Sequence, residues 1–253
     1  GSFSYDQGWI ADLRAIWRDT LQAKDDLPVA TGTCTTPLRA GLFEAWVTNT
    51  GDPAMPVVKW LRHGAPAGIR SHVPDMGIYP PKLPEETLSI EELEDQTVEF
   101  DTNYLSLEDD DEADQIVKDL IDPKKGWTRV FKSKADCKAY LQGEEPIPSQ
   151  MGLVVKDVTD DTGEVVSQKK RLILDAKRSL VNSSSAPQQR TIMPGSMDAV
   201  DDAIYMRRMA KRLGLNIDHI AQCVAHYSGD FFMVPHEFQE RRFQCARWKN
   251  LWI

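Results

Sequence analysis

The spacing of hydrophobic residues predicts that the chain begins with helices. Between residues 5 and 25 apolar side chains recur at steps of three and four, which is the period of an amphipathic helix. These positions are Trp9, Ile10, Leu13, Ile16, Trp17 and Leu21. A second helix is expected over residues 37–47, and a third opens at residues 52–53 and stops at Gly64. Residues 1–69 are therefore predicted to form a helical N-terminal region.

The following segment has a different composition. Four Pro and one Gly lie within residues 70–84, which is typical of an extended linker. Residues 85–114 contain 14 acidic side chains and no basic one. One short helix is expected from about residue 106 to residue 121, because Asp122–Pro123 would end it. Residues 70–124 are therefore predicted to be a Pro-rich and acidic linker with a short helix.

The clearest pattern in the chain is that of a β-hairpin. Residues 151–158 are rich in the β-branched side chains that strands favour, residues 159–163 have turn chemistry, and a second strand runs over residues 164–175. Before the hairpin we expect a short strand over residues 126–131. A helix capped by Ser133 should follow that strand and end at Gly143.

Beyond the hairpin the pattern is mixed. A helix is expected over residues 196–214, with acids in its first turns and bases in its last turns. Residues 215–227 fit either a strand or a short helix. A helix should begin at residues 231–234, and residues 242–246 should form a strand. The fold class is therefore predicted to be α+β, with a third region over residues 125–253.

The composition limits the class of protein and its expected cellular compartment. A hydrophobic content of 41% and seven Trp favour a folded chain of 253 residues over a disordered one. No apolar run approaches the roughly 20 residues that cross a bilayer, and the first residues do not resemble a secretion signal. The four cysteines are far apart and form no CxxC pair. We therefore expect an intracellular, reduced protein of the cytoplasm or nucleus, without a membrane partner.

Charge is segregated along the chain. The net charge is -9, which disfavours contacts with phosphate groups. Residues 168–253, however, carry 14 Lys and Arg against 8 Asp and Glu, a balance of +6, so residues 1–167 carry -15. A basic module behind an acidic arm is compatible with nucleic-acid binding, although ordinary solvated surface would give the same totals.

Two segments of the basic module resemble a known family. The first contains Arg171, Asp175, Lys177, Arg178 and Asn182. The second contains Phe231, Phe232, Pro235, Arg242 and Phe243. In this order, about 55 residues apart and behind a hairpin, the segments resemble the fingers and the start of the palm of retroelement (retrotransposon) reverse transcriptases. The resemblance covers roughly residues 152–246.

The resemblance implies RNA-directed DNA synthesis on an RNA or DNA primer–template. It places Lys170, Arg171 and Phe231 at nucleotide-binding positions, where the donor fork of an arginine suits triphosphate oxygens. It makes Asp175 a brace of the strand. The positions that it assigns to nucleic-acid binding are Lys169, Lys177, Arg178 and Arg242.

The catalytic positions depart from the family pattern. His226 stands where the family has its first metal-binding Asp, and imidazole is a poor ligand for Mg²⁺. A local shift would make Asp230 the metal ligand instead. The chain ends before the Tyr/Phe-x-Asp-Asp motif that supplies the other carboxylates of the two-metal site. We therefore expect a fragment that is inactive alone. Mg²⁺ is implied by the resemblance only, and the alternative is that this chain binds no cofactor.

A second interpretation remains open. The basic hairpin and the helical region would also suit a non-enzymatic module that binds nucleic acid or another protein. The sequence indicates neither the template nor the oligomeric state.

Overall fold

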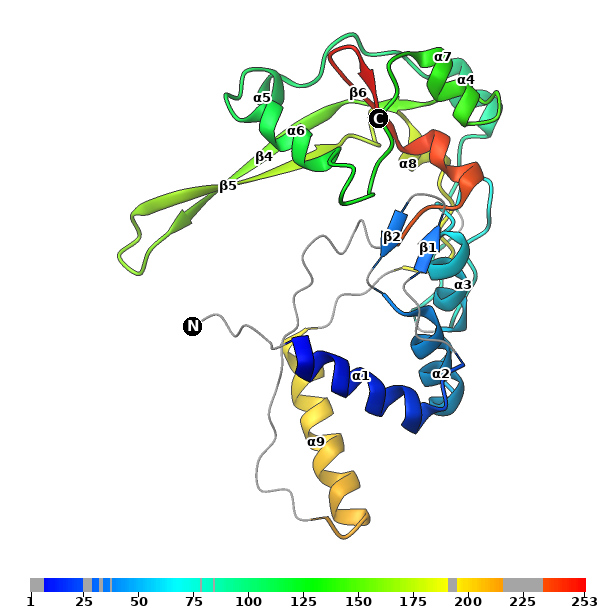
Figure 1. Ribbon diagram of the computed structural model, residues 1–253, viewed down its shortest axis with the longest axis vertical. Coiled ribbons are helices and arrows are strands. Elements are labelled where there is room, and N and C mark those ends of the chain that lie inside the picture. Colours follow the sequence, from blue (N-terminus) through cyan, green and yellow to red (C-terminus); the bar gives the residue numbers. More distant parts are fainter. Residues whose placement is uncertain are drawn as a thin grey trace.

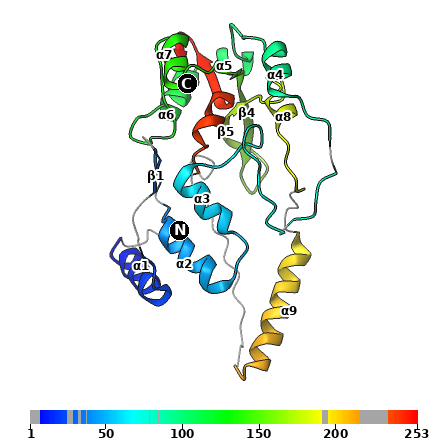
Figure 2. The same cartoon turned by 90° about the vertical axis from the view of Figure 1, so that its right-hand side faces the viewer.

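The computed structural model describes residues 7–24, 29–31, 34–36, 38–77, 79–83, 85–190, 195–215 and 234–253. Its architecture is α+β, as the sequence pattern predicts. The helices of residues 7–63 lie at one end of the molecule, and the elements of residues 90–184 gather at the other (Figure 1). A single helix, residues 196–212, points away from the rest in both views (Figure 2).

The three predicted N-terminal helices are confirmed. They are α1 (Gln7–Leu21), α2 (Ala40–Thr50) and α3 (Met55–His63). Trp17 of α1 and Trp46 of α2 meet with ring centroids 4.7 Å apart. Ala40 of α2 and Leu61 of α3 are buried together. A small antiparallel pair, β1 (Val29–Thr31) and β2 (Cys34–Thr36), connects α1 to α2 and lies outside the helical prediction.

The acidic middle segment is folded, which corrects the expectation of one short helix. It forms α4 (Ile90–Gln96), α5 (Leu105–Glu108) and α6 (Ala113–Leu120). The side chains of Leu93, Leu107 and Val117 are at most 1% exposed, so each of the three helices buries an apolar residue. The division of the chain at residues 69 and 124 stays a prediction, but its middle part packs into the body.

In the sheet region the predicted kinds of element are present, but their boundaries differ from the predicted ones. Helix α7 (Lys134–Tyr140) begins at Ser133, whose hydroxyl accepts the Asp136 N–H as expected. Strand β3 (Pro148–Ser149) pairs in parallel with β6 (Cys245–Trp248), and β6 pairs antiparallel with β7 (Leu251–Trp252). The strand expected over residues 126–131 is reduced to a bridge between Phe131 and Trp252.

The predicted hairpin is confirmed as β4 (Met151–Thr159) and β5 (Val165–Leu174). Asp160 closes its turn, because its Oδ1 atom accepts the backbone N–H groups of Thr162 and Glu164. Met151 and Leu153 are buried at the base, whereas the rest of the hairpin extends from the body as an exposed ribbon (Figure 1). After β5 come the short helix α8 (Val181–Ser184) and the long helix α9 (Ser196–Arg212).

A 3-10 helix, η2 (Phe238–Gln244), occupies most of the segment expected to be a strand over residues 242–246. Its tight winding turns Glu240, Arg242 and Phe243 inward. The Glu240 carboxylate is fully buried and accepts the backbone N–H groups of Arg70 and Ser71, at 3.0 and 2.7 Å. The helix thus fixes the segment that follows α3, far away in the sequence.

Arg242 makes a second set of long-range contacts from η2. Its guanidinium group is 2% exposed and donates to Glu94 and Glu144, each at 2.6 Å. Glu144 also accepts from Arg70, and these two arginines lower the pKa of its carboxyl group, with Arg70 as the larger cause. The buried guanidinium group of Arg242 therefore connects η2 to α4 and to Glu144 in the segment that follows α7.

The loop before η2 lies against the end of α3. Ala65 donates to the Pro235 carbonyl and accepts from the Glu237 N–H, at 2.6 and 3.0 Å. Gly64 is needed here, because its φ is +101° and a Cβ atom would lie 2.4 Å from the Glu237 nitrogen. His236 sits in this junction, and burial lowers the pKa of its imidazole, while Glu240 opposes the shift and Arg241 adds to it.

Replacing Arg242 with Ala is expected to destabilise the fold by about 2–4 kcal/mol, because the change removes the cation that holds two carboxylates and leaves a cavity. Urea unfolding followed by tryptophan fluorescence measures the change. Lys249→Ala is the matched control, since it breaks an ion pair with Asp114 whose side chains are 59% and 51% exposed. Equal loss of stability in both variants would contradict the linking role of Arg242.

The His236 junction predicts a loss of stability in mild acid. Because the folded pKa lies below the ordinary value of 6.5, the unfolded chain binds the proton more readily. His236 therefore stabilises the fold above about pH 6.5, and this contribution falls as the pH decreases below that value. The urea midpoint should drop between pH 7.5 and pH 5.5, and by less in His236→Gln. An unchanged drop in the variant would assign the effect to other groups.

Candidate nucleic-acid interface

The register of the hairpin sorts its side chains onto two faces. Directly paired residues of an antiparallel ladder point to the same side, and successive residues alternate. Val154 pairs with Arg171, and Lys156 pairs with Lys169. These side chains therefore share one face, which we term the open face. The other face, termed the covered face, carries the pair of Val155 and Lys170.

The open face is basic and exposed. Its three cations, Lys156, Lys169 and Arg171, form no ion pair within the described part of the chain. The register adds the buried Gly152 and the exposed Ser167 to this face, and no acidic residue. Its apolar members are Val154, Val158 and Ile173, which are between 41% and 48% exposed. Such a surface can bind an extended anion without first breaking an internal salt bridge.

The covered face turns toward the acidic segment. At its base Leu153 and Leu172 pack against Leu107 of α5 and Val117 of α6. Further out, Lys170 lies 2.7 Å from Asp110 and 2.9 Å from Glu112. The hydrogen bond that Lys170 donates lowers the pKa of Asp110, and donation to Asp110 and then to Glu112 raises the pKa of Lys170. The nucleotide-binding residue expected at position 170 is thus already engaged with two carboxylates.

The end of β5 is held by Asp175. Its Oδ2 atom accepts the Tyr104 hydroxyl at 2.5 Å, and its Oδ1 atom accepts the backbone N–H groups of Lys177 and Arg178. These bonds lower the pKa of Asp175 and raise that of Tyr104, with the hydrogen bond between the two side chains as the largest cause. The contacts agree with the bracing role expected at position 175.

Two of the expected nucleic-acid-binding cations follow this brace. Lys177 and Arg178 are both exposed. The Arg178 guanidinium carbon lies 5.4 Å from the centre of the Phe100 ring and 5.9 Å from that of Tyr104, so the side chain rests on an aromatic surface. Both residues lie at the base of the hairpin, in the same part of the fold as Arg171.

Arg242 lies apart from this group. Its buried guanidinium group is committed to Glu94 and Glu144 in the body of the protein, and the structure does not bring it to the hairpin. The sequence pattern misses this because it predicts a strand, with alternating exposure, where the chain forms the 3-10 helix η2. Conversely, Lys156 belongs to the open face although the sequence analysis does not select it. The period-two alternation of residues 151–158 is the signal that would have found it.

The expected catalytic positions are not part of the described structure. His226, Asp230 and Phe231 lie outside the described residues, so their assignments stay predictions. Among the residues that are described, no group of three or more His, Cys, Asp or Glu side chains is arranged to hold a metal ion. The Mg²⁺ that the resemblance implies therefore stays a prediction, and we derive no step through it.

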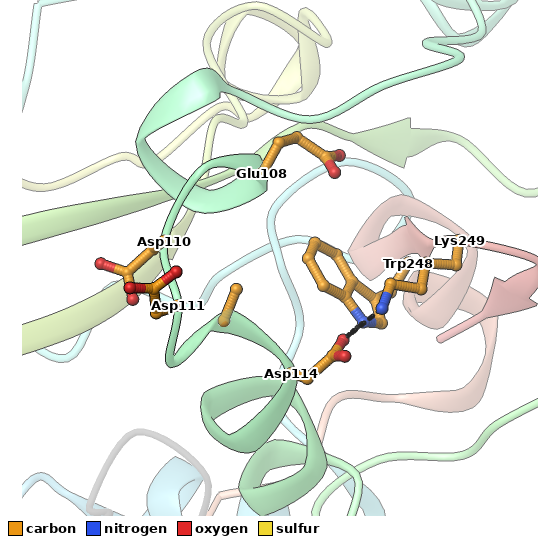
Figure 3. A pocket seen from close by; sticks show the side chains of 7 residues that line it. Glu108, Asp110, Asp111, Asp114, Trp248 and Lys249 are labelled. Atoms are coloured by element: carbon orange, nitrogen blue, oxygen red, sulfur yellow. Dashed lines mark hydrogen bonds and ion pairs between the residues drawn. The ribbon is translucent and has the colours of Figure 1, made fainter.

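An acidic pocket lies beside the covered face (Figure 3). It is lined by Glu108, Asp110, Asp111, Ala113, Asp114, Trp248 and Lys249. Asp114 accepts from the Trp248 indole at 3.2 Å and from Lys249 at 2.6 Å, and the bond to Lys249 is the main reason that its pKa is lowered. Asp110 is paired with Lys170. Ion pairs of the lining carboxylates thus connect residues 108–114 to Lys170 of β5 and to Lys249, which follows β6.

Comparisons with known proteins identify no relative. No protein-family model, no curated protein and no solved structure matches this chain. Within the described residues, no helix combines the length and the apolar character needed to span a membrane.

Proposed function

We propose that this chain is the fingers and the beginning of the palm of a reverse-transcriptase-like polymerase, and that the open face binds the backbone of an RNA or DNA primer–template. One observation carries the proposal. Three cations, Lys156, Lys169 and Arg171, form no ion pair with any described residue and lie on one exposed face of the hairpin, which carries no acid on that side. The order of sequence motifs in residues 152–246 supplies the polymerase interpretation.

Physical chemistry favours phosphate as the partner of this face. Lys and Arg that neutralise phosphates release condensed counterions, which supplies much of the binding free energy at moderate salt. Residues two apart on a strand are about 6.6 Å apart along it, so Lys169 and Arg171 can contact separate phosphate groups. Because acidic and basic residues are segregated along the chain, the open face can attract phosphate although the net charge of the chain is -9.

In this proposal each remaining basic residue has a separate role. Arg171 offers a guanidinium fork to a backbone phosphate of the bound nucleic acid, and Lys169 adds positive charge beside it. Lys177 and Arg178 extend the basic surface past the Asp175 brace. Arg242 has a structural role, because its guanidinium group is paired with Glu94 and Glu144. Polymerisation is not part of the proposal for this chain.

The second candidate is a non-enzymatic module that binds nucleic acid or a protein through the same hairpin. One observation favours it: Lys170 and Arg242, two of the residues that the resemblance assigns to nucleotide and nucleic acid, are ion-paired inside the protein. A surface that uses only the open face needs neither residue.

Removing two cations from the open face is expected to weaken binding to a fluorescent RNA–DNA duplex and to flatten its salt dependence. In Lys169→Gln/Arg171→Gln the slope of log K against log salt should decrease by about 1.4–1.8, because each lost phosphate contact contributes about 0.7–0.9. Fluorescence anisotropy at several salt concentrations measures the slope. Lys59→Gln/Lys132→Gln removes the same charge from two exposed sites outside the hairpin. An equal decrease in that control would reject a defined binding face.

Primer extension separates activity from binding. With oligo(dT) on poly(A) and Mg²⁺, we expect the full chain to bind the primer–template without extending it. Extension that Asp230→Asn abolishes would overturn the prediction of inactivity and would make Asp230 a metal ligand. If the open-face variant loses affinity for single-stranded, duplex and hybrid nucleic acid equally, with no extension in the unmodified chain, the non-enzymatic module is favoured.

A further inference from the structure

Two cysteines that are far apart in the sequence are buried next to each other. Cys137 lies in α7 and is 1% exposed, and Cys245 opens β6 and is 5% exposed. Both are free thiols in one apolar cluster with Leu141 and Trp252, and the rings of Phe131 and Tyr140 pack against that cluster. The sequence contains no CxxC pair, and 107 residues separate positions 137 and 245.

The two thiols share this cluster, and each shifts the pKa of the other. The Cys245 thiol donates to the Arg241 carbonyl oxygen at 3.6 Å. Neither cysteine belongs to a cluster of potential metal ligands within the described residues. A metal site therefore does not explain the pair, and the proposed nucleic-acid interface does not use it.

We propose that Cys137 and Cys245 form a covalent modification site, at which a small peroxide converts the two thiols into a disulfide that joins α7 to β6. The Cys137 thiolate attacks one peroxide oxygen, an S–O bond forms, the O–O bond breaks, and the departing hydroxide takes a proton to become water. The Cys245 sulfur then attacks the sulfenic acid, so that an S–S bond replaces the S–O bond and a second water leaves. The two thiols supply the two electrons that reduce the peroxide.

The surroundings determine which thiol reacts first. The neighbouring Cys245 thiol lowers the pKa of Cys137, whereas Cys137 and burial raise the pKa of Cys245. The thiolate is the nucleophile toward peroxide, so Cys137 attacks and Cys245 resolves. Burial of both sulfurs selects a small oxidant, because a bulky disulfide reagent would have to displace the rings of Phe131 or Tyr140.

The bond would join two elements that only packing and hydrogen bonds now hold together. Helix α7 precedes β3, and β6 is the central strand of the sheet formed by β3, β6 and β7. A disulfide across this contact closes a loop of more than 100 residues, which restricts the unfolded chain strongly. The thermal midpoint is therefore expected to rise by about 5 °C or more on oxidation.

The test uses the full chain with Cys34→Ser and Cys223→Ser, treated with hydrogen peroxide, quenched by alkylation and analysed by peptide mass spectrometry. The expected product is a peptide pair linked through Cys137 and Cys245, formed faster in the folded protein than in urea. A linkage that forms no faster in the folded protein would overturn the proposal, because the fold would then not pre-position the two sulfurs.

Single replacements test the order of the two steps. In Cys245→Ala the reaction should stop at a sulfenic acid on Cys137, which dimedone traps. In Cys137→Ala, dimedone labelling of Cys245 should be at least several-fold slower. Alanine keeps both sites apolar, and circular dichroism checks that each variant is folded. If either variant fails to fold, the corresponding serine variant takes its place, and equal labelling of the two cysteines would contradict the assigned roles.

Discussion

Burial of two opposite charges on one short 3-10 helix holds distant parts of this chain together. Glu240 binds backbone N–H groups of residues that follow α3, and Arg242 binds carboxylates from α4 and from the segment after α7. Burying a charged side chain costs free energy unless polar groups pair with it. The elements that supply the partners of Glu240 and Arg242 must therefore stay packed against η2. The position of the sheet, and of the hairpin that extends from its base, depends on this arrangement.

The two faces of the hairpin show how the period of a β-strand separates structure from function. Lys170 and Arg171 are neighbours in sequence, yet one is neutralised by Asp110 and Glu112 while the other faces solvent. The acidic segment therefore does not cancel the charge of the whole hairpin. It neutralises Lys170 on the covered face, so the hairpin attracts an anion through its open face.

Sequence patterns were sufficient where local chemistry decides the structure. The hairpin, the Ser133 cap and helix α9 follow from alternation, capping and turn residues close together in the chain. They were insufficient where tertiary contacts decide it. Helix α4 has the local signal of a capping box, Ser89 with Glu92, but its composition suggests solvated linker until Leu93 is seen to be buried.

The candidate site shows the same division. Lys169 and Arg171 could be selected from the sequence because the hairpin is a local structure. The engagement of Lys170 depends on Asp110, which lies 60 residues earlier, and the burial of Arg242 depends on Glu94 and Glu144. The sequence likewise does not show that Cys137 and Cys245 share one buried cluster, since neither residue has a cysteine near it in the chain.

The hairpin has one more consequence, which follows from its having only two strands. Beyond its base, β4 and β5 each leave one row of backbone groups without a strand beside it, so the exposed ribbon consists of two edges. Exposed edges carrying Val154, Val158 and Ile173 would invite the hairpin of another molecule to pair with them. The cations on the same face oppose this pairing, because two such ribbons repel each other at short range. The lysines and arginine that would attract phosphate thus also protect the protein from assembling with copies of itself.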